Sequence, residues 1–76
     1  MKNAYIKIDS ISDVKDFVNI VSKYDFDADL ESGRYAVDAK SIMGIFSLDL
    51  SKEIKLIVHS DDCDDFMNEI SKFIVK

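Results

Sequence analysis

The spacing of the apolar residues changes several times along this short chain, and that change limits the folds it can adopt. Apolar and polar residues alternate over residues 2–8, which is the period of a half-buried strand. From Ile11 to Tyr24 the apolar residues recur every three or four positions, which predicts a helix. Ser10 is the expected N-cap of that helix, with Asp13 as its capping partner. Strand and helix are therefore both predicted within the first third of the chain.

The remaining residues predict a hairpin, a short helix, a strand and a final helix. Alternation around Ser32-Gly33 indicates two strands joined by a tight turn, because glycine readily adopts the positive φ that such turns need. Residues 41–48 predict one or two helical turns capped by Ser41. Residues 53–59, rich in Ile, Leu and Val, predict a strand central in the sheet. Ser60 is expected to cap the last helix. The apolar stripe of that helix comprises Phe66, Met67, Ile70, Phe73 and Ile74.

The predicted order, β-α-β-β-(short α)-β-α, fits one domain spanning residues 1–76. A chain of this length buries only about 60% of the surface that its unfolded form exposes, so it has no room for a second core. Its residues are 47% hydrophobic, which separates it from disordered chains. Short connections between alternating strands predict an α+β fold, with one antiparallel sheet and the helices packed on one face.

Charge and composition exclude several classes of protein. The net charge is −5 and the ten basic residues are scattered, whereas a nucleic-acid interface needs them on one face. No apolar run approaches the roughly 20 residues that cross a bilayer, and the N-terminus has no apolar signal segment. A single cysteine forms no internal disulfide. We therefore expect a cytoplasmic protein without nucleic-acid or membrane partners.

Three features suggest chemistry, and each has a simpler interpretation. His59, the only histidine, is expected on the open face of the sheet as a solvated residue, with no catalytic partner nearby in the sequence. Cys63 is interpreted as structural, since the neighbouring aspartates oppose a thiolate. The acidic cluster at residues 61–65 lacks the glycine and the ligand spacing of an EF-hand loop. We interpret it as favourable charge at a helix start and predict no metal site.

The string KSIMGIFSL at residues 40–48 resembles the regulatory segment of the HPr family, the phosphocarriers of the sugar phosphotransferase system. There, a K-S-I-M-G-V-M-S-L-like string surrounds a serine that a dedicated kinase phosphorylates. Residues 22–24 (SKY) and 37–39 (VDA) fit the family's S-K-F and V-N-L strings without a gap, so the resemblance covers nearly the whole chain. It implies an HPr-like open-faced β-sandwich with strand order 1-4-2-3. The side chains expected to be most buried are Ile6, Phe17, Val21, Leu30, Val37, Leu56, Val58, Phe66 and Ile70.

The same resemblance implies that the family's phosphocarrier chemistry is lost. Counting back from Ser22 without a gap places the family's H-A-R-P motif on residues 10–13, where Ser10 replaces the histidine, Ser12 the arginine and Asp13 the proline. A serine hydroxyl without an activating base is a weak nucleophile, whereas a neutral imidazole is a good one near pH 7. The free N–H groups of a helix start still allow a weak anion site there, which Asp13 opposes.

Ser41 aligns with the family's regulatory serine. Its phosphorylation would add about −1.5 to −2 charges at the start of the short helix. As an N-cap alone the same residue stabilises by roughly 1 kcal/mol, and the two roles are compatible. The resemblance makes Ile42, Met43 and Phe46 an apolar docking patch beside this serine. The alternative is that at least one of the three belongs to the core.

Two hypotheses follow. The first is a non-catalytic regulatory or adaptor protein, similar to the Crh-type members that lack the phosphocarrier histidine, with a role in catabolite regulation. Its partners would be an HPr kinase/phosphorylase and a transcription regulator that reads the phosphoserine. The alternative is an HPr-fold interaction module with no remaining phosphotransferase role. Neither hypothesis involves a cofactor or makes the chain an enzyme.

Overall fold

Strands and helices alternate through the computed structural model, which describes residues 1–75. In chain order the elements are β1 (Lys2–Ile6), α1 (Ile11–Ser22), β2 (Ala28–Ser32), β3 (Tyr35–Asp38), α2 (Ile42–Phe46), β4 (Ile54–Val58), α3 (Asp64–Glu69) and the 3₁₀ helix η1 (Ser71–Phe73). This order agrees with the predicted one, with η1 added near the C-terminus.

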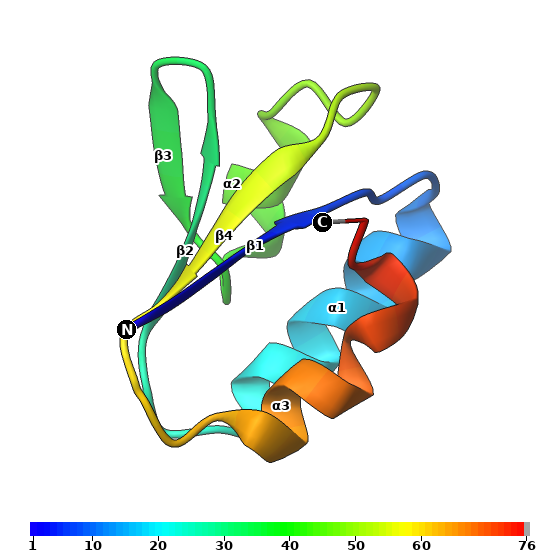
Figure 1. The fold of residues 1–76 in the computed structure, drawn as a ribbon. Coiled ribbons are helices and arrows are strands. Elements are labelled where there is room, and N and C mark those ends of the chain that lie inside the picture. The colour runs from blue at the N-terminus through cyan, green and yellow to red at the C-terminus, as the bar shows by residue number, and fades with distance from the viewer. Residues whose placement is uncertain (76) are drawn as a thin grey trace.

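The strands form one four-stranded antiparallel sheet in the order β1-β4-β2-β3, as predicted. β4 pairs on both sides, so Leu56 lies between Ala4 of β1 and Leu30 of β2. Successive side chains of a strand point to opposite faces, and these three are buried on the face toward the helices. Figure 1 shows α1 and α3 together on that side of the sheet. The α+β open-faced sandwich is therefore confirmed.

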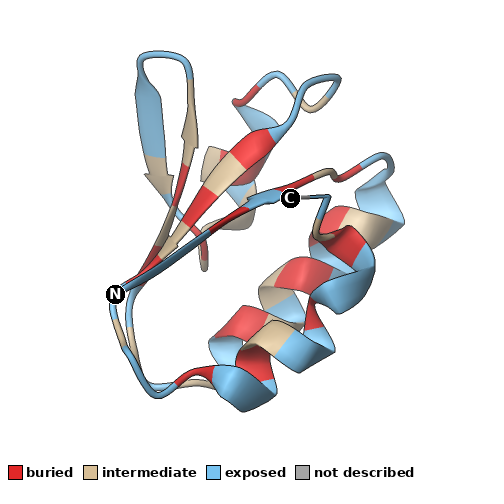
Figure 2. Ribbon diagram, in the orientation of Figure 1, coloured by how far each residue is buried: buried red, intermediate tan, exposed pale blue. Residues whose placement is uncertain are grey.

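The core fills the space between the sheet and the helices, where the buried residues gather in Figure 2. Most of the side chains expected to be buried are fully inaccessible, namely Ile6, Phe17, Val21, Leu30, Leu56, Val58, Phe66 and Ile70. Val37 is the exception, because it is only half-buried. It lies on β3, an edge strand that is covered by one neighbouring strand instead of two.

The last helix starts later than predicted. α3 begins at Asp64 with Cys63 as its N-cap. Ser60 is not a cap: its hydroxyl accepts a hydrogen bond from the N–H of Asp62 at 3.2 Å, in the turn before the helix. The thiol of Cys63 makes no capping bond and is buried in the core. The prediction was wrong because burial of this small, apolar side chain fixes where the helix starts.

Two elements are shorter than predicted. α3 ends at Glu69, so Phe73 lies in η1 and Ile74 in an extended segment, and neither continues a single helical stripe. β1 ends at Ile6 and not at Ile8, although Ile8 is fully buried.

The C-terminal segment covers the outer edge of β1. The N–H of Lys7 donates to the carbonyl of Phe73, and the N–H of Val75 donates to the carbonyl of Tyr5, both at 2.8 Å. These bonds satisfy main-chain groups that an edge strand otherwise leaves to solvent. One edge of the sheet is thereby closed by the chain itself.

The turn between β2 and β3 has the geometry predicted for a tight hairpin. Ser32 pairs with Tyr35, which leaves Gly33 and Arg34 as the two turn residues. Gly33 has a φ of 61°, and no non-glycine residue in the described part of the chain has a positive φ. Glycine at the first central position is typical of the type II′ turn, which suits the twist of a hairpin.

A hydrogen-bonded cluster joins the C-terminal ends of α1 and α3. The hydroxyl of Tyr24 donates to Glu69 Oε2 at 2.6 Å, and Lys23 Nζ donates to Glu69 Oε1 at 2.8 Å. The bond to Glu69 raises the pKa of Tyr24 to about 12, while the bonds from Lys23 and Tyr24 lower the pKa of Glu69. The Tyr24 ring also packs edge-on against Phe66 of α3, with centroids 5.4 Å apart.

Truncation of a core side chain tests the packing of the helices on the sheet. Phe17→Ala or Ile70→Ala should each lower the free energy of unfolding by roughly 2–5 kcal/mol, because each removes a fully buried side chain and leaves a cavity. Urea unfolding followed by circular dichroism measures the loss. Asn19→Ala, on the exposed side of α1, is the control and should change it by less than about 0.5 kcal/mol. A similar small loss for Phe17→Ala would contradict this packing.

The Tyr24–Glu69 bond predicts a loss of stability at alkaline pH. The folded pKa of Tyr24 is raised above its ordinary value of 10.0, so its contribution is complete below pH 10 and is lost as the pH rises toward 12. The difference in free energy of unfolding between wild type and Tyr24→Phe should therefore be constant near neutral pH and shrink above pH 10. Denaturant titrations across this range measure it. Tyr35→Phe is the control, and an equal pH dependence for that variant would contradict the assignment.

Candidate functional site

Ser41 caps the short helix α2, as its sequence position predicts. Its backbone is extended, with φ −97° and ψ 106°, and its hydroxyl oxygen accepts a hydrogen bond from the N–H of Gly44 at 3.1 Å. Its carbonyl accepts the next helical bond, from the N–H of Ile45 at 3.0 Å. Ser41 itself is half-buried. The cap fixes the direction of its side chain at the helix start.

Gly44 lets α2 approach the sheet closely. A Cβ atom at this position would lie 3.1 Å from Cβ of Val37 on β3 and 3.2 Å from Oγ of Ser41. Both contacts are shorter than ordinary van der Waals distances, so any side chain there would press on β3 and on the cap. The glycine of the KSIMG string therefore has a packing role.

The three apolar residues next to Ser41 differ in their exposure to solvent. Ile42 is half-buried and packs against the core. Met43 is 76% exposed and Phe46 is 41% exposed. Met43 and Phe46 thus form an exposed apolar surface, which we name the α2 patch, whereas Ile42 belongs to the margin of the core. Sequence alone left patch and core open for all three.

Two lysines hold the ends of the α2 segment against the segments that flank α1. Lys40 Nζ donates to the carbonyl of Tyr24, just after α1, at 3.0 Å. Lys7 Nζ, from the segment before α1, donates to the carbonyl of Leu50 at 3.1 Å. The start of the α2 segment therefore lies near the end of α1, and the loop after α2 lies near its beginning. Both contacts are far apart in sequence and carry no local signal.

Ser10 is the N-cap of α1, as predicted, but the carboxylate of Asp13 bonds the residue before the cap instead of the cap itself. The hydroxyl oxygen of Ser10 accepts a hydrogen bond from the N–H of Asp13 at 3.1 Å. The carboxylate of Asp13 accepts one from the N–H of Asp9 at 3.3 Å. Ser12 is exposed, and Ile11 is 63% exposed. The helix start thus already holds a carboxylate, whose charge opposes the binding of another anion.

His59 lies at the other end of the β1–β4 pair. Ser10 follows the end of β1 where Ile6 pairs with Ile54, whereas His59 follows Val58, which pairs with Lys2. The separation means that the only histidine of the chain takes no part in the α1 start.

The ring of His59 has an acidic partner that sequence reasoning missed. Its Nε2 lies 2.7 Å from Asp29 Oδ2, and both side chains are partly exposed on the open face of the sheet. Asp29 is thirty positions away in sequence and reaches the histidine only through the pairing of β2 with β4.

The acidic segment before α3 is divided between a turn and the helix. Asp61 and Asp62 precede the helix, whereas Asp64 and Asp65 lie in its first turn, where they favour the helix dipole. The N-terminal amine bonds Asp61 and lowers its pKa. In the described residues, no group of His, Cys, Asp and Glu side chains could hold a metal ion. None of the described helices has the length and apolar character to cross a membrane.

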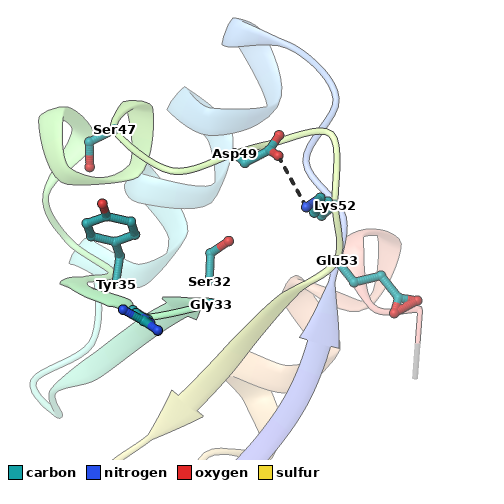
Figure 3. Close-up of a pocket in the computed structure, with 8 residues that line it drawn as sticks. Ser32, Gly33, Tyr35, Ser47, Asp49, Lys52 and Glu53 are labelled. Atoms are coloured by element: carbon teal, nitrogen blue, oxygen red, sulfur yellow. Dashed lines mark ion pairs between the residues drawn. The ribbon is translucent and has the colours of Figure 1, made fainter.

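A pocket of about 420 Å³ opens between the hairpin turn, the end of α2 and the loop before β4 (Figure 3). Tyr35 and Ser47 point toward one another across it, and Asp49 and Lys52 form an ion pair at 3.9 Å on another side. None of the predicted site residues lines this pocket. No motif in the sequence marks it, because its walls come from segments joined only by folding.

Comparison with known proteins agrees with the fold. The family model described as "PTS HPr component phosphorylation site" matches residues 13–76. The structure of HPr-C-His from Thermoanaerobacter tengcongensis is similar, with 30% sequence identity and a TM-score of 0.79, over 95% of this chain and 89% of that chain.

Two further structures share the fold at lower identity. The phosphocarrier protein HPr from Bacillus anthracis is 19% identical, with a TM-score of 0.70, over 97% of this chain and 96% of that one. The Bacillus subtilis catabolite repression protein Crh, solved as a swapped dimer, is 23% identical, with a TM-score of 0.66, over 93% of this chain and 88% of that one. From the match over most of its length, together with the order of its strands, this chain belongs to the HPr family.

Proposed function

We propose that this chain is a regulatory or adaptor member of the HPr family that does not carry a phosphoryl group on histidine. The position that resembles the family's phosphocarrier histidine is Ser10, and its hydroxyl oxygen already accepts the capping bond from Asp13. The only histidine, His59, lies at the opposite end of the β1–β4 pair and bonds Asp29. That partner is a carboxylate, whose charge opposes a phosphoryl group on the ring.

The observation that carries the regulatory proposal is the position of Ser41 at the start of α2, next to the exposed α2 patch. A phosphate there can accept hydrogen bonds from the N–H groups of the first turn. It would add about −1.5 to −2 charges beside Met43 and Phe46. An adaptable methionine and an aromatic ring next to a switchable charge suit a protein partner that distinguishes the two states.

The partners we propose are an HPr kinase/phosphorylase, which would modify Ser41, and a transcription regulator that reads the phosphoserine. Both place the protein in the cytoplasm and in catabolite regulation. The remaining family roles, as enzyme substrate and phosphate donor, require the histidine that Ser10 replaces.

A second candidate is an HPr-fold interaction module without a phosphotransferase role. Ser12 favours this candidate. The family's motif has an arginine at this position, which can bind a phosphate in a bidentate geometry, and a serine cannot. In that case the α2 patch would bind a partner irrespective of Ser41.

The first test is phosphoryl transfer. Incubation with enzyme I and phosphoenolpyruvate should leave this protein unmodified, because Ser10 is a weak nucleophile and Asp13 repels the incoming phosphate. Ser10→His alone should not restore full transfer, since Asp13 remains and Ser12 provides no clamp. Intact-mass spectrometry before and after acid treatment detects the labile phosphate. An HPr with an intact H-A-R-P motif is the positive control.

The variant His59→Asn identifies the acceptor if a phosphate does appear. Acid-labile phosphate on wild type that disappears in this variant would make His59 the carrier and would overturn the proposal. The same variant should be indistinguishable from wild type if the proposal is right.

The second test is modification of Ser41. A cognate HPr kinase with ATP should add one phosphoryl group to wild type but not to Ser41→Ala. Ser12→Ala, which removes an exposed serine near another helix start, is the control and should be modified like wild type. Phosphorylation should change the free energy of unfolding by no more than about 1 kcal/mol, because the charge lies at a partly exposed helix end. Phosphosite mass spectrometry and urea unfolding measure the two effects.

Partner capture separates the two candidates. Pull-downs from the native cytoplasm with wild type, Ser41→Asp and Met43→Ala should differ: Ser41→Asp alters the captured proteins and Met43→Ala weakens their binding in both states. Absence of kinase modification, together with capture that depends on Met43 but not on Ser41, would favour the plain interaction module.

A further inference from the structure

The two edges of the sheet differ in how their main-chain groups are satisfied. The β1 edge is covered by the C-terminal segment, through the bonds of Lys7 to Phe73 and of Val75 to Tyr5. No described strand pairs with the β3 edge, and only its last residue, Asp38, has its outward carbonyl bonded, by the N–H of Ser41. Figure 1 shows the β2–β3 hairpin projecting away from α1 and α3. β3 is therefore an open edge strand.

The backbone of β3 presents hydrogen-bonding groups outward. Ser32 and Tyr35 close the two-residue turn, and the closing pair of such a turn exchanges both main-chain bonds. Because bonded and non-bonded pairs alternate along an antiparallel ladder, the N–H and C=O of Ala36 point away from β2. Natural edges are protected by short strands, charged residues, Pro or a bulge; β3 is short and ends in Asp38, but it has no Lys, Pro or bulge.

The sequence of this edge is self-complementary. It reads Arg34, Tyr35, Ala36, Val37, Asp38. Antiparallel pairing with a second copy, centred on Ala36, places residue 34 opposite residue 38 and residue 35 opposite residue 37. Arginine then faces aspartate twice, tyrosine faces valine twice, and the small alanine lies on the two-fold axis. Each of these cross-strand combinations is favourable.

The two charged side chains at this edge, Arg34 and Asp38, form no ion pair with a described residue. Arg34 is the only arginine of the chain. Asp38 lies directly opposite Asp29 on β2, and like charges in that position repel. Asp29 has His59 as a partner at 2.7 Å. The carboxylate of Asp38 instead accepts a hydrogen bond from the main-chain N–H of Lys40, at 2.8 Å. The ammonium group of Lys40 donates to a main-chain carbonyl and not to Asp38. An arginine from a second molecule would satisfy both needs.

Tyr35 is the most exposed apolar residue of the edge, whereas Val37 packs in part against the core and α2. The side chain of Tyr35 is 73% exposed, although it lies on a strand, and Val37 is half-buried. In the paired arrangement each tyrosine ring would pack on the valine of the other copy. Aromatic and β-branched residues form favourable cross-strand pairs.

We propose that β3 is a homotypic interface, at which two copies of this chain join their sheets through antiparallel β3 strands. A contact made by one short strand buries a small area, so we expect the dimer to be weak. The interface does not use the start of α1, Met43 or Phe46. Asp38, at its end, also bonds the N–H groups of Lys40 and Ser41 before α2. The interface does not depend on the function proposed above.

Charge reversal with complementation tests the register. Wild type should self-associate in sedimentation velocity as its concentration rises to about 1 mM. Arg34→Glu and Asp38→Lys should each weaken association by about tenfold or more, because like charges then face each other at both ends of the interface. An equimolar mixture of the two variants should associate again, since opposite charges then face each other at both ends. Lys15→Glu, on the exposed side of α1, is the charge-matched control.

Two further measurements keep the outcome decisive. Amide chemical-shift changes with concentration should centre on residues 34–38, and circular dichroism should show that each variant is folded. Ala36→Pro should also abolish association without unfolding, because it removes an N–H that the β2–β3 ladder does not use. A wild type that is monomeric at the highest concentration overturns the proposal. So does a dimer that persists in both single variants, or a mixture that fails to reassociate.

Discussion

The fold depends most on β4, a central strand with hydrogen-bonded neighbours on both sides and three fully buried residues that face the helices. Ile54, Leu56 and Val58 alternate with residues of the open face, so a shift of one residue would turn all three to solvent. That register aligns β1 and β2 on either side. It also forms the apolar face of the sheet against which Phe17 and Phe66 pack. The sheet thereby determines where α1 and α3 lie, because the apolar face of each helix is buried against this one apolar face of the sheet.

The parts that sequence predicted are those with a local physical signal. The alternation of β4, the caps at Ser10 and Ser41 and the positive φ of Gly33 each depend on residues within a few positions. Features that depend on distant contacts were missed. The start of α3 depends on burial of Cys63, and the covering of β1 depends on where the C-terminal segment returns. Val37 was misjudged because its alternation marks the buried face of the strand, whereas its burial is limited by the edge position that the strand order gives it.

The candidate site divides in the same way. The capping geometry at Ser41 could be predicted from the sequence. The difference in exposure between Met43 and Ile42 could not, because it depends on how α2 packs on β3 at Gly44. The pocket beside Tyr35 and the pair of His59 with Asp29 combine strands that are far apart in sequence. Neither has a motif, because a tertiary arrangement alone brings these groups together.

Separate contacts support the starts of α1 and α2. Residues at one start can therefore be substituted without a change in the geometry of the other. Ser10 is held by a local capping bond from the N–H of Asp13, so substitutions there alter chemistry without moving the sheet. Ser41 is positioned by its neighbour Lys40, whose Nζ bonds the Tyr24 carbonyl and whose N–H bonds Asp38. Those contacts join the start of the α2 segment to the end of α1 and to β3. The start of α1 can thus vary while Ser41 keeps its place at the start of α2, and the proposed function rests on that independence.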